Sequence, residues 1–122
     1  MKILVVDDHP DSVDSLCRLL QAHGHETACA YDGRQALEVF RQFEPAVVVL
    51  DIDMPILDGY GTARAIRLTP SHRLPVLVAL TALTGHDARR QAFDAGFDAH
   101  LAKPARIEAL LELIEKLVRE RS

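Results

Sequence analysis

The sequence has no long uninterrupted apolar run. Its longest apolar stretches, residues 46–50 and 76–80, are far shorter than the roughly 20 residues that a helix needs to cross a bilayer. Residues 1–6 are too short for the apolar part of a signal peptide, and no small-residue cleavage site follows them. We therefore expect a cytoplasmic protein with no membrane partner.

Cysteine is also scarce. The two cysteines, Cys17 and Cys29, form no CxxC pair, so the sequence indicates neither a zinc framework nor a disulfide scaffold. We expect both to be reduced, structural thiols. The six histidines show no HExxH spacing on an expected helix, so a zinc site is not expected from them either.

Positive charge is in deficit. The formal net charge is -4 and the sequence pI is about 5.8, the opposite of the basic stripe that nucleic-acid binders carry. Binding of nucleic acid by this domain is therefore not expected. The 122 residues, 48% apolar and 26% charged, are typical of one globular domain with one core.

Short β-branched runs alternate with helical patterns along the chain. The intervening segments carry apolar residues at helical spacing, and Pro104 is expected to open the last of these helices. Strands this short and apolar, each followed by a helix, indicate a doubly wound α/β domain of five βα units, with a parallel sheet covered on both faces. The expected strands are residues 2–6, 26–30, 46–50, 76–80 and 98–101.

Polar residues gather where these strands end. In open parallel sheets, ligands bind beyond the carboxyl ends of the strands, so residues at these positions are the candidates for a site. Three carboxylates in one place repel one another unless a cation lies among them, and oxygen ligands suit Mg²⁺. The candidates are Asp7, Asp8, Asp51, Thr81 and Lys103, with Asp53 just beyond the third strand.

The remaining candidates suit a phosphoryl group. The Lys103 ammonium supplies a positive charge for an anion, and the Thr81 hydroxyl supplies a hydrogen bond. A carboxylate such as Asp51 can attack phosphorus and form an aspartyl phosphate. Each residue alone also has an ordinary role as a helix cap, loop or turn residue. Their joint occurrence at the ends of four strands favours the functional interpretation.

Four motifs, ILVVDD, VVLDIDMPILDG, LTA and KP, resemble those of the receiver domains of two-component signalling. The resemblance covers residues 1–122 and implies that they form one receiver domain. It implies a flavodoxin-like fold with strand order 2-1-3-4-5. It also implies a phosphoacceptor that slowly removes its own phosphoryl group and is not a turnover enzyme on its own. It also implies a histidine kinase or histidine phosphotransfer protein as partner, and it is compatible with a weak homodimer.

The same resemblance assigns roles to the candidates. It makes Asp51 the phosphoacceptor and has Thr81 and Lys103 contact the phosphoryl group. The implied ligands of Mg²⁺ are Asp8, Asp51 and the backbone carbonyl of Asp53, with Asp7 acting through water.

One position departs from the family pattern. The family usually has Tyr or Phe three residues before the lysine, where it acts with the threonine as a rotameric switch, and this chain has His100. We take Thr81 and His100 as the switch pair and expect altered signal output. The segment GFDAHLAKP resembles receivers fused to hybrid sensor kinases. The chain is thus either a module of such a kinase or a stand-alone receiver.

Two other functions compete with this interpretation. Asp51-Ile52-Asp53 resembles the start of the DxDx(T/V) signature of haloacid-dehalogenase-like phosphatases, but Pro55 stands where that signature has Thr or Val. The other alternative is a binding module that has lost phosphorylation, although every site position holds a competent residue. A dinucleotide-binding Rossmann domain is excluded because no GxGxxG follows the first strand.

Overall fold

Five parallel strands form one sheet in a computed structural model that describes residues 1–52, 59–70, 74–82 and 86–121. The sheet order is β2-β1-β3-β4-β5, which confirms the expected doubly wound topology. The strands are β1 (Lys2–Val6), β2 (Glu26–Ala30), β3 (Val47–Asp51), β4 (Val76–Thr81) and β5 (Ala99–Ala102). The helices are α1 (Pro10–Ala22), α2 (Gly33–Phe43), α3 (Gly59–Leu68), α4 (His86–Ala95) and α5 (Ile107–Arg121).

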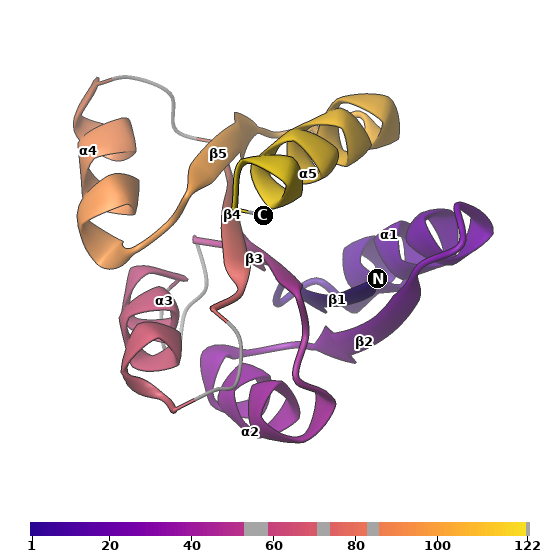
Figure 1. The fold of residues 1–122 in the computed structure, drawn as a ribbon, viewed down its shortest axis with the longest axis horizontal. Helices are drawn as coiled ribbons and strands as arrows, with labels where there is room; N and C mark the ends of the chain where they lie inside the picture. The colour runs from indigo at the N-terminus through magenta and orange to yellow at the C-terminus, as the bar shows by residue number, and fades with distance from the viewer. Residues whose placement is uncertain (53–58, 71–73, 83–85, 122) are drawn as a thin grey trace.

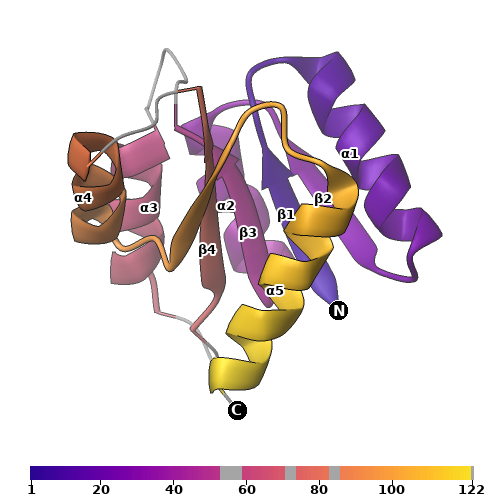
Figure 2. The same cartoon turned by 90° about the horizontal axis from the view of Figure 1, so that it is seen from above.

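The helices cover both faces of the sheet. Helices α1 and α5 lie on one face, and α2, α3 and α4 lie on the other (Figures 1 and 2). Because side chains alternate along a strand, each strand supplies both layers of the core. In β1, for example, Ile3 and Val5 pack on the α1 side, while Leu4 and Val6 pack on the α2 side.

Local signals place the helix ends. Helix α1 begins at Pro10, and the Asp32 side chain caps α2 by accepting a 2.7 Å hydrogen bond from the Gln35 N–H. Gly96, with φ of 106°, follows the last residue of α4. One expectation is wrong: Pro104 does not open α5, because the helix begins at Ile107, where the Arg106 carbonyl accepts a 3.0 Å hydrogen bond from the Leu110 N–H.

The start of β5 also differs by one residue from the expected strand. Asp98 lies outside β5 because its carboxylate accepts a 2.8 Å hydrogen bond from the Leu77 N–H and contacts Arg67 at 3.0 Å. Within the described ranges, no helix is long and apolar enough to cross a membrane.

Candidate functional site

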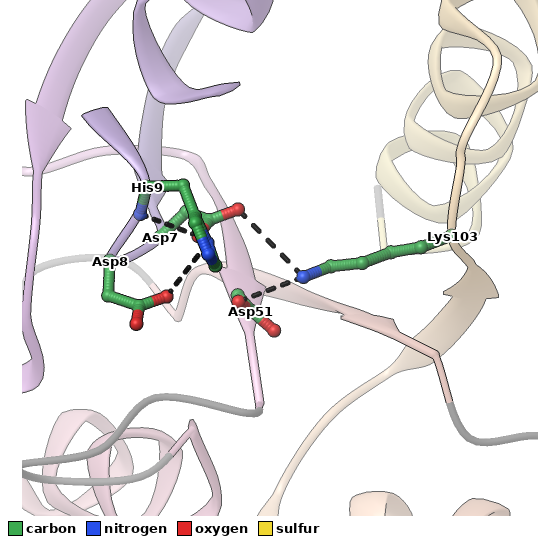
Figure 3. Close-up of polar contacts among 5 residues, drawn as sticks. All are labelled: Asp7, Asp8, His9, Asp51 and Lys103. Carbon is green, nitrogen blue, oxygen red and sulfur yellow. Dashed lines mark hydrogen bonds and ion pairs between the residues drawn. The ribbon is translucent and has the colours of Figure 1, made fainter. Parts of the chain in front are cut away.

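Three carboxylates meet at the carboxyl ends of β1 and β3. These strands are neighbours, and their register pairs Val6 with Leu50, so the next residues, Asp7 and Asp51, reach the same level. The Asp7 N–H donates a 3.2 Å hydrogen bond to Ala30 O, which holds the end of β1 against β2. Asp51 is only 1% exposed. The predicted convergence of Asp7, Asp8 and Asp51 is confirmed (Figure 3).

Lys103 reaches the same point from β5. Its Nζ lies 2.9 Å from Asp51 Oδ2 and 3.9 Å from Asp7 Oδ2 (Figure 3). The Lys103 backbone N–H donates a 2.9 Å hydrogen bond to Thr81 O, which extends the β4–β5 pairing by one residue. The main chain therefore aims the ammonium at the buried Asp51 carboxylate.

His9 is a member of the site that the sequence interpretation missed. Its Nδ1 lies 3.0 Å from Asp7 Oδ1 and 3.1 Å from Asp8 Oδ1, and its backbone N–H donates to the same Asp7 oxygen at 3.0 Å. The only signal in the sequence was its place directly after the acidic pair. His9 ties the two carboxylates together on the solvent side, where its side chain is 70% exposed.

Crowding changes the acidity of these groups. Burial raises the pKa of Asp7, and the nearby Asp51 charge adds to that effect, while hydrogen bonds from His9 and the Lys103 charge oppose it. The hydrogen bond to Asp7 raises the pKa of His9, with help from the Asp8 and Asp7 charges. A cation bound among these carboxylates would offset their mutual repulsion.

The donor set fits a divalent cation. Asp7, Asp8, His9 and Asp51 each offer one ligand atom, and these atoms all lie within 4.8 Å of one another. Three of the four donors are carboxylate oxygens, the hard ligands that Mg²⁺ accepts. Asp53, whose backbone carbonyl was expected to contribute, lies outside the described residues.

Thr81 and His100 lie on one face of the sheet. Thr81 ends β4 and is 1% exposed, and half-buried His100 pairs with Ala79 in the register of β4 and β5. Paired residues of neighbouring strands share a face, as do residues two apart on a strand. Ala79 packs with the α3 and α4 core, so both side chains belong to that face.

A groove of about 620 Å³ runs beside the carboxylates. It lies between α1 and the segment that connects β5 to α5, and it reaches Asp7 and Lys103. Its α1 wall mixes apolar and hydroxyl side chains, namely Ser12, Val13, Ser15, Leu16 and Leu19. Leu19 is 45% exposed although it is apolar.

Comparison with known proteins gives a consistent result. The family model described as the response regulator receiver domain matches residues 3–115. Response regulator MprA of Mycolicibacterium vanbaalenii is 42% identical over 119 residues, which are 98% of this chain and 51% of that protein. The chain thus spans about half the length of this curated relative.

Solved structures show the same likeness. Chemotaxis protein CheY4 of Vibrio cholerae superposes with a TM-score of 0.89 at 28% identity, covering 94% of this chain and 96% of that one. The receiver domain of a signal transduction histidine kinase from Syntrophus aciditrophicus gives 0.85 at 26%, covering 98% and 90%. A chemotaxis protein and the receiver domain of a histidine kinase therefore share this architecture.

Proposed function

Since the chain belongs to the response regulator receiver domain family, we propose that its Asp51 takes a phosphoryl group from a phosphohistidine. The observation that carries the proposal is the buried Asp51 carboxylate, which ends β3 with Lys103 Nζ 2.9 Å away and two more carboxylates beside it. Neither alternative function is favoured by the comparisons, which match receivers throughout.

The chemistry needs only a positioned nucleophile and compensating charge. An Asp51 oxygen attacks phosphorus, the bond from phosphorus to the donor imidazole nitrogen breaks, and that nitrogen keeps the electron pair. Lys103 then turns from the Asp51 carboxylate to the phosphoryl oxygens, because its ammonium already lies at that carboxylate. The Thr81 hydroxyl donates a hydrogen bond to the same oxygens. We propose that this contact starts the switch of the Thr81 and His100 pair.

A magnesium ion fits this proposal. Asp8 and Asp51 would hold it directly, Asp7 through water, and Asp53 through its carbonyl, which lies outside the described residues. When bound, Mg²⁺ offsets negative charge on the phosphoryl oxygens. The product stays on Asp51, so residues 1–122 would act as one stoichiometric receiver domain and not as a turnover enzyme.

The partner is a protein that carries a phosphohistidine, either a histidine kinase or a histidine phosphotransfer protein in the cytoplasm. We propose that it docks at the groove beside α1, because that groove is partly apolar and leads to Asp7 and Lys103. A stand-alone receiver and a hybrid-kinase module are both compatible with the chain.

Intact-mass spectrometry after treatment with acetyl phosphate and Mg²⁺ tests the proposal. We expect the wild-type chain to gain about 80 Da, the mass of one phosphoryl group, and Asp51→Asn to gain nothing, because an amide is no nucleophile here. An unmodified wild type, or equal labelling of the variant, would show that Asp51 is not the acceptor.

A further inference from the structure

The two cysteines of the chain touch each other, away from the acidic site. Cys17 on α1 and Cys29 on β2 are free thiols, and their Sγ atoms lie 2.9 Å apart. Cys29 pairs with Val5 in the sheet, and Val5 faces the α1 layer of the core. Since α1 covers the β2 edge of that face, the fold brings these two sulfur atoms together from separate elements.

Hydrogen bonds on both sides hold the pair in register. One turn earlier on α1, Asp14 Oδ1 accepts a 3.0 Å hydrogen bond from the Tyr31 hydroxyl. One turn later, Gln21 Nε2 donates a 2.7 Å hydrogen bond to Thr27 Oγ1. Helix positions three and four apart share a face, and alternate strand residues share a face, so Cys17 and Cys29 form the middle contact of a row of three.

The separation is close to that of a covalent bond. A disulfide has an S–S distance of about 2.0 Å, so the sulfur atoms would approach by roughly 0.9 Å from their 2.9 Å separation. The closed loop would run from Cys17 to Cys29 and include the α1–β2 connection, residues 23–25.

We propose that Cys17 and Cys29 are an oxidative modification site, at which a hydroperoxide converts the two thiols into an intramolecular disulfide and a dithiol restores them. The site is independent of Asp51 and of the acidic cluster. Its product would fix α1 covalently to the edge strand β2.

The environments of the two sulfur atoms set the order of events. Cys17 is buried, and burial together with the hydrogen bond to Cys29 raises the pKa of the Cys17 thiol to about 12. Cys29 is half-buried on the edge strand, so a small oxidant reaches it more readily. Cys29 therefore reacts first, and Cys17 completes the bond.

The reaction balances with hydrogen peroxide as the oxidant. The Cys29 sulfur attacks one peroxide oxygen, the O–O bond breaks, and one water leaves as Cys29 becomes a sulfenic acid. The Cys17 sulfur then attacks the Cys29 sulfur, the S–O bond breaks, and the second water leaves with the Cys17 proton. Two sulfur atoms are oxidised and two peroxide oxygens are reduced.

Intact-mass and peptide mass spectrometry of the peroxide-treated chain test the proposal. We expect a monomer lighter by about 2 Da, two hydrogen atoms, with one peptide pair joined through Cys17 and Cys29. Dithiothreitol should restore the original mass. The oxidised chain should melt roughly 5–15 °C above the reduced chain, because the cross-link restricts the unfolded state.

Single variants separate the two roles. In Cys17→Ser, dimedone should trap the sulfenic acid on Cys29, and in Cys29→Ser, Cys17 should stay unmodified under the same treatment. Two unmodified thiols in the wild type after treatment that oxidises a simple peptide thiol would overturn the proposal. Disulfides between chains instead of within them, or a lower melting temperature on oxidation, would overturn it as well.

Discussion

Charge balance at the acidic site depends on a few side chains that reach one point. Asp7 and Asp51 carry negative charge next to each other, and Lys103 compensates part of it at 3.9 and 2.9 Å. A lysine ammonium is a compact point charge that a metal ion or a phosphoryl group can replace or redirect. Under the proposed function, Lys103 would exchange the Asp51 carboxylate for the phosphoryl group.

Removal of one acidic side chain should separate direct from indirect metal ligands. We expect Asp8→Ala to weaken Mg²⁺ binding about 100-fold and Asp7→Ala about tenfold, because our proposal has Asp8 bind the ion and Asp7 act through water. Isothermal titration calorimetry of both variants measures this. Wild-type affinity in both variants would mean that the acidic cluster is not the metal site.

Loss of the Lys103 ammonium should leave metal binding intact. In Lys103→Ala we expect Mg²⁺ to bind at least as tightly as in the wild type, because a cation that competes for the Asp51 carboxylate is gone. Amide shifts of β4 and β5 on phosphorylation should shrink, since the lysine no longer links the phosphoryl group to β5. Metal affinity reduced tenfold, or unchanged amide shifts, would contradict this role.

At the scale of elements, the helix and strand pattern could be predicted from local sequence, but several contacts between elements could not. The Asp32 cap and the Gly96 helix end are read from neighbouring residues. By contrast, Arg67 donates to the Gly96 carbonyl and to Asp98, which lie 29 and 31 residues away in the sequence, and to the nearer Pro75 carbonyl. Such contacts between α3, β4 and the end of α4 exist only after the elements pack.

The site residues likewise divide into those that the sequence predicted and those that it did not. Asp7, Asp51 and Lys103 were predicted because parallel strands end at one edge of a sheet. His9 was missed because its role depends on a side-chain direction that no periodicity encodes. The contact of Cys17 with Cys29 was missed for a related reason, since no short cysteine motif announces a pairing between a helix and a strand.

The start of α3 carries a tight backbone contact beside the site. A Cβ added at Gly59 would overlap Ile52 Cα and lie 2.7 Å from Asp51 O. We expect Gly59→Ala to lower the free energy of unfolding by about 1–3 kcal/mol or more, because the backbone next to Asp51 must move. Phosphorylation by acetyl phosphate should also slow.

Urea unfolding and labelling rates measure these two effects. Exposed Arg64 on the same helix gives a matched control, since Arg64→Ala should change stability by no more than about 0.5 kcal/mol. Equal stability of Gly59→Ala and the control would show that the contact of Gly59 with the Asp51–Ile52 backbone can relax without displacing Asp51.

At the scale of the whole molecule, the two faces of the sheet serve different surfaces. The acidic site opens beside α1 and the β5–α5 connection, whereas Thr81 and His100 face the α3 and α4 layer. Under the proposed function, the phosphodonor would approach on one side while Thr81 and His100 would respond on the other. Asp51 ends β3 and Thr81 ends β4, and these strands are neighbours in the sheet. Their pairing would link phosphorylation of Asp51 to the response of Thr81 and His100.

This division predicts that donor docking and the chemistry at Asp51 can be separated by mutation. Leu19 lines the groove and is 45% exposed, so Leu19→Glu should place a charge in the docking surface without disturbing the buried core. We expect phosphotransfer from a cognate phosphohistidine protein to slow by about tenfold or more, as an interface side chain worth over 1.4 kcal/mol implies. Labelling by acetyl phosphate, which needs no docking, should keep its wild-type rate.

Arg18→Glu supplies the matched control, because Arg18 is an exposed α1 residue that does not line the groove. Rates of both reactions, measured by loss of the phosphohistidine and by gain of mass on the receiver, distinguish the outcomes. Equal slowing of both reactions in Leu19→Glu would mean that the substitution perturbs the site itself. Unchanged transfer from the protein donor would place its docking surface elsewhere than the groove beside α1.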